Sequence, residues 1–207
     1  MTDPRRATVE AYQSFAAAYA AATPGLPTQV RFDIAAFVAR VGEGAEVLEI
    51  GSGPGRDACA LEAAGLVVRR TDITPAFVDL LRADGHDADV VDPLVDDLGG
   101  PWDAVWSNAA LLHVARDDLA TVLARLAAVT RPGGVLFLSV KEGDGEAWST
   151  HGKVAAPRHF TYWREQPLRE VLAGAGWTVE VVNQTESARD RWLDVVATAA
   201  PTGSEHR

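Results

Sequence analysis

From residue 45 onward, short aliphatic runs alternate with longer stretches that carry the apolar spacing of amphipathic helices. The aliphatic runs predict seven strands, at residues 45–50, 66–72, 88–92, 102–108, 134–140, 177–184 and 191–199. Helical stretches separate most of these strands, at residues 56–65, 74–85, 116–134 and 163–176. Two more helices, over about 5–22 and 27–41, precede the first strand and are broken at "TPGLP".

Alternation of strands and helices predicts a mostly parallel sheet that is covered on both faces. The last two strands are separated by too few residues for a crossover helix, so we expect them to pair as an antiparallel hairpin. The predicted fold is α/β: a Rossmann-like, doubly wound, seven-stranded sheet, mostly parallel, with an antiparallel C-terminal hairpin strand. One domain should cover residues 45–200, followed by a tail at 201–207.

Composition narrows the classes of partner and compartment. The chain of 207 residues has a formal net charge of −10, which disfavours an extended nucleic-acid footprint, because each phosphate contact needs a Lys or Arg. It contains one cysteine, Cys59, which fits a reducing cytoplasm and excludes an internal disulfide or a cysteine metal cluster. No apolar run reaches the length of a membrane span, and no signal peptide is expected. We therefore expect a cytoplasmic protein without nucleic-acid or membrane partners; its oligomeric state is not predicted.

Three glycines follow the first predicted strand in "VLEIGSGPGRD", residues 47–57. Glycines allow positive φ and let a ligand approach the backbone, and the helix that follows offers free N–H groups. The spacing is G-x-G-x-G, whereas the dinucleotide fingerprint is G-x-G-x-x-G, and the P-loop ending Gly-Lys-Ser/Thr is absent. The second strand ends at Asp72, where a carboxylate can accept hydrogen bonds from two ribose hydroxyls. Together these features indicate a nucleoside-bearing cofactor, although a tight turn and a helix-capping Asp72 remain alternatives.

The chain resembles a class I methyltransferase that uses S-adenosyl-L-methionine. The resemblance covers residues 45–140 and rests on "VLEIGSGPGRD", "TDITP", "DAVWSNAALLHV" and "RPGGVLFLSV", with the terminal hairpin expected in this family. It implies that residues 1–44 form helices capping the cofactor site. It also implies cofactor-binding roles for Glu49, Gly51, Ser52, Gly53, Gly55, Asp72, Ile73, Asp92, Leu94 and Asn108.

One N-terminal helix often caps the cofactor in such proteins, and "YQSFAAAYA" offers Tyr12 and Tyr19. We assign Tyr19 to the cofactor and Tyr12 to the acceptor, with a core position as the alternative for each. The prolines of nucleic-acid amino methyltransferases are missing from "SNAALL", and the carboxylates of catechol-type enzymes and the paired glutamates of arginine methyltransferases are missing as well. The acceptor is therefore expected to be a small molecule with an oxygen or nitrogen nucleophile.

The stretch 141–162 is too long for an ordinary connection and lies at the predicted cofactor edge. We expect a substrate lid here, with a disordered connector as the alternative. Six residues of this stretch and of the last strand are candidate acceptor contacts: Lys141, Glu142, Arg158, Tyr162, Arg191 and Trp192. The competing interpretation is a solvated rim with Trp192 in the core.

His113 follows the fourth strand by about five residues, and a neutral imidazole at that position can accept a proton from the acceptor. We expect it to be the general base, with helix capping or packing as the alternative. Two other classes of function stay open, a catalytically silent cofactor-binding scaffold and a nicotinamide-dependent oxidoreductase. Within the methyltransferases, an RNA methyltransferase is the remaining alternative.

Overall fold

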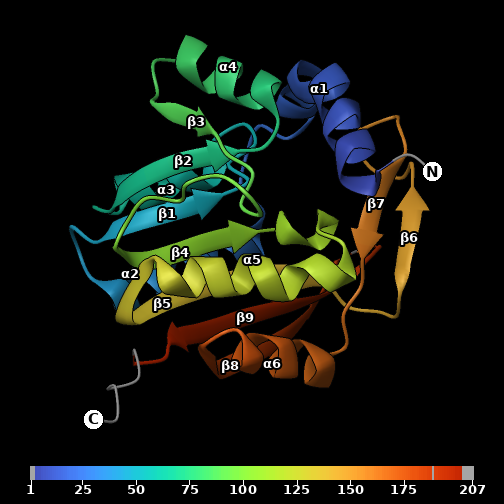
Figure 1. The fold of residues 1–207 in the computed structure, drawn as a ribbon. Coiled ribbons are helices and arrows are strands. Elements are labelled where there is room, and N and C mark those ends of the chain that lie inside the picture. Colours follow the sequence, from blue (N-terminus) through green and yellow to red (C-terminus); the bar gives the residue numbers. More distant parts are fainter. Residues whose placement is uncertain (1–2, 188, 202–207) are drawn as a thin grey trace.

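The computed structural model describes residues 3–187 and 189–201, in which seven strands form a central sheet between two layers of helices (Figure 1). The strand order is β3-β2-β1-β4-β5-β9-β8. The bounds are β1 Glu46–Ile50, β2 Val67–Asp72, β3 Ala88–Val90, β4 Trp102–Asn108, β5 Thr130–Lys141, β8 Trp177–Glu186 and β9 Arg191–Ala199. Neighbouring strands from β3 through β5 run parallel, whereas β9 lies antiparallel to both β5 and β8. The predicted fold class, including the C-terminal hairpin, is confirmed.

Helices cover both faces of this sheet. They are α1 Pro4–Ala22, α2 Thr28–Val41, α3 Arg56–Ala63, α4 Pro75–Ala83, α5 Arg116–Ala128 and α6 Glu165–Gly174, with a short 3₁₀ turn, η1, at Leu111–His113. The apolar sides of α5 and α6 pack on the front face in Figure 1, and those of α2 and α3 pack on the back. No helix among the described residues is both long and apolar enough to cross a membrane.

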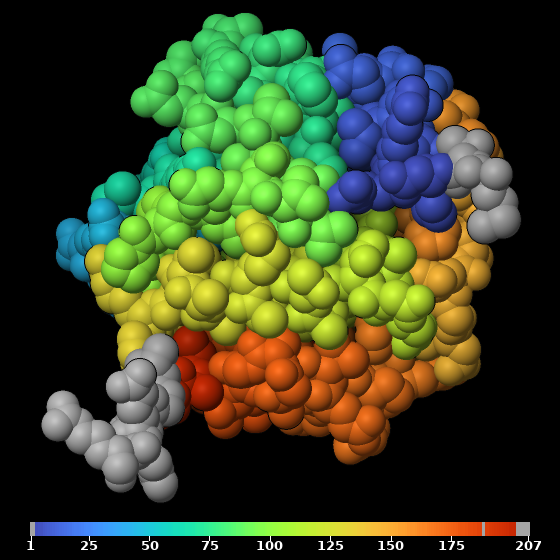
Figure 2. Space-filling view, viewed as in Figure 1, coloured from blue at the N-terminus to red at the C-terminus, as the bar shows by residue number. Residues whose placement is uncertain are grey.

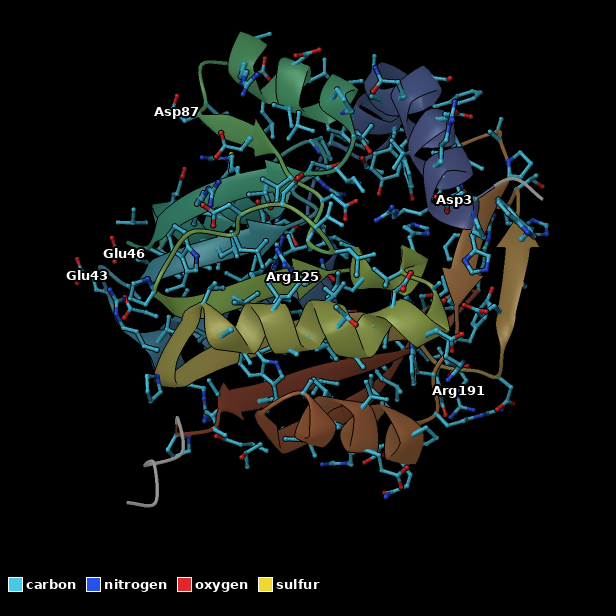
Figure 3. The ribbon with its side chains drawn as sticks, viewed as in Figure 1. Asp3, Glu43, Glu46, Asp87, Arg125 and Arg191 are labelled. Carbon is cyan, nitrogen blue, oxygen red and sulfur yellow. The ribbon has the colours of Figure 1, made fainter. Side chains whose placement is uncertain are left out.

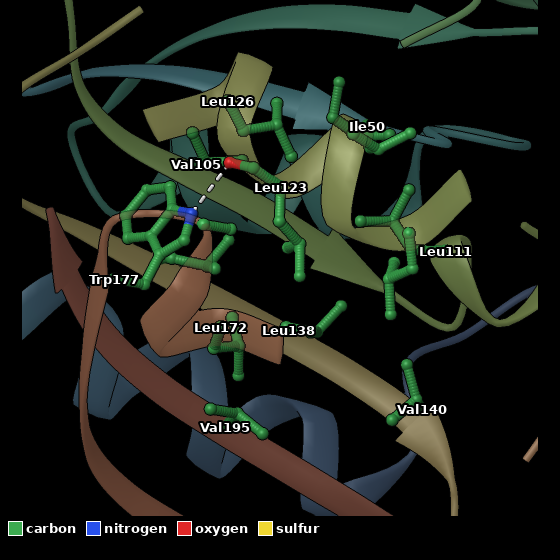
Figure 4. Packing of buried hydrophobic residues seen from close by; sticks show 14 of the residues in the cluster. Ile50, Val105, Leu111, Leu123, Leu126, Leu138, Val140, Leu172, Trp177 and Val195 are labelled. Atoms are coloured by element: carbon green, nitrogen blue, oxygen red, sulfur yellow. Dashed lines mark hydrogen bonds between the residues drawn. The ribbon is translucent and has the colours of Figure 1, made fainter. Parts of the chain in front are cut away.

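Large side chains fill each layer. On the α5–α6 face, Trp177 is buried and donates its indole N–H to the carbonyl oxygen of Leu123 at 2.9 Å (Figure 4). On the other face, Trp106 stacks on Phe137 with 4.0 Å between ring centroids, and Phe37 of α2 meets it edge-on. Burial of these rings fixes the position of β4, and therefore of the residues at its carboxyl end.

One helix boundary was predicted wrongly. The sequence predicts a helix over 116–134, but α5 ends at Ala128 and β5 already begins at Thr130. Pro132 disfavours the helical conformation at the residue before it, and Thr130 instead pairs with Trp102 in the sheet. The segment "RPGG" therefore belongs to the strand.

Residues 141–162, for which we expect a substrate lid with a disordered connector as the alternative, form regular structure that the sequence does not predict. They contain two antiparallel strands, β6 Glu146–Ser149 and β7 Arg158–Thr161, paired from Glu146–Thr161 to Ser149–Arg158. We call these two strands the β6–β7 ribbon. It stands at the edge of the molecule beside α1 (Figure 1). The predicted tail, 201–207, lies outside the described residues except for Pro201.

Candidate active site

One pocket opens at the carboxyl ends of β1, β2 and β4, beneath α1. This is the switch in strand order, where open α/β sheets bind ligands. In the space-filling view α1 lies at the surface between α4 and the β6–β7 ribbon, so it forms one wall of this pocket (Figure 2). The predicted residues that line it are Tyr12, Tyr19, Gly51, Ser52, Gly53, Asp72, Ile73, Asp92, Leu94, Asn108 and His113.

The glycine loop needs its glycines for different reasons. Gly51, Gly53 and Gly55 all have positive φ, at 80°, 51° and 81°. A side chain at Gly51 would collide with Ala110, and one at Gly55 would collide with Leu81, so these two glycines allow close packing of the protein itself. Nothing lies within 4 Å of the place that a Cβ would take at Gly53. Gly53 lines the pocket, and the open space beside its Cα suits a ligand that approaches the backbone.

Asp72 ties the end of β2 to this loop. Its Oδ2 accepts a hydrogen bond from the N–H of Gly53 at 2.8 Å, and its Oδ1 accepts one from the N–H of Thr74 at 2.7 Å. Burial raises the pKa of this carboxyl group, while the two backbone N–H groups counteract that rise. The carboxylate is thus held in one orientation at the wall of the pocket.

The loop after β3 closes the far end of the pocket. Asp92 accepts the N–H of Leu94 at 3.0 Å and forms a 2.6 Å ion pair with Arg5 of α1. Leu94 lines the pocket beside this pair. Arg5 was not predicted from sequence, because a residue 87 positions away gives no local signal.

Asn108, at the end of β4, lies in the pocket wall with its side chain fixed. Its amide donates to Oδ2 of Asp57 at 2.8 Å, and the indole N–H of Trp106 donates to the same oxygen at 3.0 Å. Sequence reasoning missed Asp57, and the missed signal was its place in the first turn of the helix that follows the glycine loop.

Two of the predicted cofactor residues, Glu49 and Gly55, do not line the pocket. Glu49 is buried behind the loop and accepts a hydrogen bond from the hydroxyl of Ser52. Burial, and then the charge of Asp57, raises the pKa of Glu49 to about 8. The structure therefore gives Glu49 a supporting position behind Ser52 rather than a position in the pocket wall.

His113 and Tyr12 meet at the α1 side of the pocket. Nδ1 of His113 is 2.6 Å from the carbonyl oxygen of His159, and Nε2 is 3.1 Å from the hydroxyl of Tyr12. A carbonyl oxygen only accepts, so Nδ1 carries the proton and Nε2 accepts from Tyr12. Burial lowers the pKa of His113 to about 4 and raises the pKa of Tyr12 to about 12. Both groups are therefore neutral near pH 7.

Tyr19 completes an aromatic cluster under α1. Its ring centroid lies 5.8 Å from that of Tyr12 and 5.7 Å from that of Phe77 in α4. All three rings line the pocket. They give this wall an apolar surface, to which Phe77 contributes without having been predicted.

The six predicted acceptor contacts do not line the pocket. At the end of β5, Lys141 pairs with Asp190 at 2.9 Å, and Glu142 is held by Arg191 at 3.1 Å. Trp192 and Tyr162 are partly buried and pack against the larger core cluster. Figure 3 shows Arg191 at the lower end of the β6–β7 ribbon, far along it from Asp3 at the start of α1. Five of the six thus gather at a rim of the sheet beside the pocket.

The sixth, Arg158, lies directly behind the pocket wall. It is buried, its Nη1 is 3.4 Å from the hydroxyl of Tyr12, and its Nη2 donates to the carbonyl oxygen of His151. Of the six residues, this one makes contact with a residue of the pocket. Acceptor binding by the six stays a prediction.

A family model described as a methyltransferase domain matches residues 26–182. Ubiquinone biosynthesis O-methyltransferase from Xanthomonas campestris pv. campestris is 36% identical over 119 residues, which cover 53% of this chain and 48% of that protein. The chain thus spans about half the length of the curated relatives it matches.

Two solved structures share the fold. The 1,6-didemethyltoxoflavin-N1-methyltransferase of Burkholderia thailandensis, with bound 1,6-didemethyltoxoflavin and S-adenosylhomocysteine, aligns over 97% of this chain and 92% of its own, at 24% identity and a TM-score of 0.75. The magnesium protoporphyrin IX methyltransferase of Synechocystis PCC 6803, with bound S-adenosylmethionine, aligns over 97% and 99%, at 17% identity and a TM-score of 0.77.

Proposed function

Since the chain belongs to the methyltransferase domain family, whose methyl donor is S-adenosylmethionine, we propose that it methylates an oxygen or nitrogen atom of a small molecule. The observation that carries this proposal is the 2.8 Å hydrogen bond between Gly53 and Asp72. This hydrogen bond holds the carboxylate of Asp72 next to Gly53, which has open space beside its Cα, and both residues line the same pocket. A nucleoside ligand fits Gly53 and Asp72. Its two ribose hydroxyls can donate hydrogen bonds to Asp72, and the chain attached to the ribose can run along the backbone at Gly53.

When bound, S-adenosylmethionine supplies an electrophilic methyl group on a sulfonium. The residues of the chain then have two tasks, alignment and handling of a proton. Asp72 and the loop Gly51–Gly53 hold the nucleoside end, and α1 covers the pocket through Tyr12 and Tyr19. We infer on this basis that the predicted capping role of residues 1–44 belongs to α1, since α2 packs on the sheet instead.

His113 and Tyr12 are the groups we propose for the proton. The lone pair of His113 Nε2 already accepts the hydroxyl proton of Tyr12. A proton leaving the acceptor can therefore pass to the Tyr12 oxygen while the Tyr12 proton passes to Nε2, so that no charge is left on the phenol. The carbonyl of His159 holds the imidazole in the required tautomer.

The proposed partner remains a small-molecule acceptor, with no nucleic acid and no membrane. The single cysteine supports the cytoplasm as its compartment. The three methyltransferases named above, two of them solved structures, have different acceptors in their names, so they do not identify the acceptor of this chain.

Calorimetry with S-adenosylhomocysteine and with reduced nicotinamide dinucleotide tests the proposal first. We expect binding of the former alone. Transfer of a labelled methyl group in a single turnover, over a panel of phenols, carboxylic acids and heterocyclic amines, then separates an enzyme from a silent scaffold. Binding of the nicotinamide dinucleotide alone contradicts the proposal, and binding of S-adenosylhomocysteine without transfer to any of the panel supports the scaffold.

A further inference from the structure

Arg158, on β7, is a buried cation without a carboxylate partner in the described part of the chain. It is 5% exposed, and none of residues 3–187 and 189–201 forms an ion pair with it. The equally buried Arg70, by contrast, binds both carboxylate oxygens of Glu62 at 2.6 Å. A buried guanidinium normally has such a partner, because the loss of hydration penalises an unpaired charge. The missing carboxylate at Arg158 therefore needs an explanation in a chain whose net charge is −10.

The hydrogen-bond donors of Arg158 are only partly used. Its Nη2 donates to the carbonyl oxygen of His151, and its Nη1 lies 3.4 Å from the hydroxyl of Tyr12, which is a long contact. Its Nε is buried and has no hydrogen-bond partner among the described residues. Since a guanidinium carries five N–H groups, this one keeps donors that suit an anion.

The surroundings of Arg158 are positively charged as well. Cζ of Arg158 and Nζ of Lys141 lie 5.3 Å and 4.5 Å from the ring centroid of Phe160, and the ring of His113 lies 4.6 Å from the same centroid. Lys141 is balanced by Asp190 at 2.9 Å, which leaves the charge of Arg158 unbalanced beside His113. Burial is the main cause of the low pKa of His113, and the charges of Arg158 and Lys141 lower this pKa further.

One side chain separates Arg158 from the pocket. Tyr12 lines the pocket, and the guanidinium lies 5.7 Å from the centroid of its ring. Because Tyr12 belongs to α1, the helix over the pocket, a shift of α1 is enough to open the way to Arg158. A carboxylate that enters beside Tyr12 exchanges the long hydroxyl contact for two parallel N–H···O bonds, the usual geometry of an arginine–carboxylate pair.

We propose that the methyl acceptor is an organic anion and that Arg158 determines this specificity by binding its carboxylate beside Tyr12 and His113. The inference rests on the proposed function, because it names the class of acceptor for that pocket. The positive charge of the methyl donor and that of Arg158 both favour an acceptor of opposite charge. The bound carboxylate also offsets the charge that opposes protonation of His113.

Pairs of aromatic ligands that differ only in a carboxylate or a carboxamide provide the test. The pairs are benzoate and benzamide, 4-hydroxybenzoate and 4-hydroxybenzamide, and anthranilate and anthranilamide. Calorimetry in saturating S-adenosylhomocysteine keeps these ligands out of the cofactor site. We expect at least one carboxylate to bind the wild-type protein about 10- to 100-fold more tightly than its carboxamide, the effect of one charged hydrogen-bonded pair.

Substitutions then assign this preference to one side chain. Arg158→Gln should remove the preference, whereas Arg158→Lys should keep part of it, because lysine retains the charge but not the two parallel N–H groups. Arg116→Gln is the matched control. Arg116 also donates to the β6–β7 ribbon, at the carbonyl oxygen of Tyr162, but its guanidinium lies over Trp163 instead of Tyr12. The ratio of the two affinities should be the same in this control as in wild type, which separates a loosened ribbon from a lost charge.

Wild-type protein that binds S-adenosylhomocysteine but no carboxylate of the set overturns the inference, and so does equal binding of the two members of every pair. A preference that persists in Arg158→Gln overturns the role of Arg158. If that variant does not fold, Arg158→Lys decides, and an undiminished preference is then the contrary result. Wild-type protein that does not bind S-adenosylhomocysteine overturns the proposed function itself.

Discussion

At His113, burial and two hydrogen bonds decide the chemistry of the ring. The carbonyl of His159 fixes the proton on Nδ1, and burial lowers the pKa to about 4. The ring is therefore a weaker base than a free histidine, but it stays unprotonated far below neutral pH. Nε2 of His113, the nitrogen that can accept a proton, is hydrogen-bonded to the hydroxyl of Tyr12. The ring can therefore take up a proton from the acceptor only through Tyr12.

We predict that His113→Ala and Tyr12→Phe each lower kcat by a factor on the order of 10² or more, with little change in S-adenosylhomocysteine affinity. Because the pKa of His113 lies near 4, kcat of the wild type should not fall through its protonation between pH 8 and pH 5.5. Steady-state kinetics over this range, with an acceptor found in the single-turnover panel, checks both points. An apparent pKa near 6.5 that disappears in His113→Ala would contradict a ring that stays neutral over this pH range.

The parts of the site that sequence could predict are local. Gly51, Gly53 and Asp72 follow from the spacing of a loop and two strands, because a few neighbouring residues determine such a turn. The contacts that complete the pocket are not local: Asp57 meets Asn108 across 51 positions, and Arg5 meets Asp92 across 87. No pattern along the chain reports that two such residues face each other.

At the scale of elements, α1 is joined to the rest of the pocket through single contacts on several sides. Arg5 pairs with Asp92, Gln13 accepts the N–H of Ala76 at 2.9 Å, and Thr8 accepts the buried N–H of His159 at 2.9 Å. The three contacts tie α1 to the loop after β3, to α4 and to β7. Polar contacts as well as packing therefore hold α1 in place over the pocket.

We predict that Thr8→Val loosens α1 without unfolding the domain. The buried N–H of His159 then loses its acceptor, which costs roughly 1–3 kcal/mol. Amide hydrogen exchange should become faster over residues 4–22, while α5 keeps its protection. Ser14→Ala is the control, because Ser14 lies on the same helix and donates only to the carbonyl of Glu10. Equal acceleration in α1 and α5 would show that Thr8 supports the whole fold instead.

Sequence patterns predicted most elements because their apolar residues recur with the period of a strand or a helix. They missed the β6–β7 ribbon for a physical reason. Its strands are four residues each, and β6 is mostly exposed, so it lacks the alternation of apolar and polar positions that marks a half-buried strand. The ribbon forms through pairing and through contact with α1, and both depend on the folded molecule.

For the molecule as a whole, buried ionisable groups link stability to pH. Glu49 is the clearest case, since burial and the nearby Asp57 raise its pKa to about 8. Between about pH 4.5 and pH 8 the folded protein keeps a proton that the unfolded chain releases, so this group makes stability fall as pH rises. His113 has the opposite effect between about pH 4 and pH 6.5, where its lowered pKa makes stability rise with pH.

We predict that Glu49→Gln removes the fall in stability between pH 5 and pH 8. The amide is neutral at every pH and can still accept the hydroxyl of Ser52. We expect urea unfolding at pH 5, 6.5 and 8 to show that the free energy of unfolding of the variant, relative to that of wild type, increases as pH rises. His113 contributes equally to both proteins, so its effect cancels in this difference. Glu43→Gln is the control, because Glu43 is exposed. Parallel curves for wild type and Glu49→Gln would mean that Glu49 is ionised in the folded protein at neutral pH.

The cover over the pocket also has a consequence for the order of events during synthesis. Thr8 is made early, but its partner His159 follows 151 positions later. At a translation rate of about 5–20 residues per second, roughly 8–30 s separate the two. Helix α1 therefore leaves the ribosome well before β7, and the Thr8–His159 contact that helps to close the pocket forms only after most of the domain has been made.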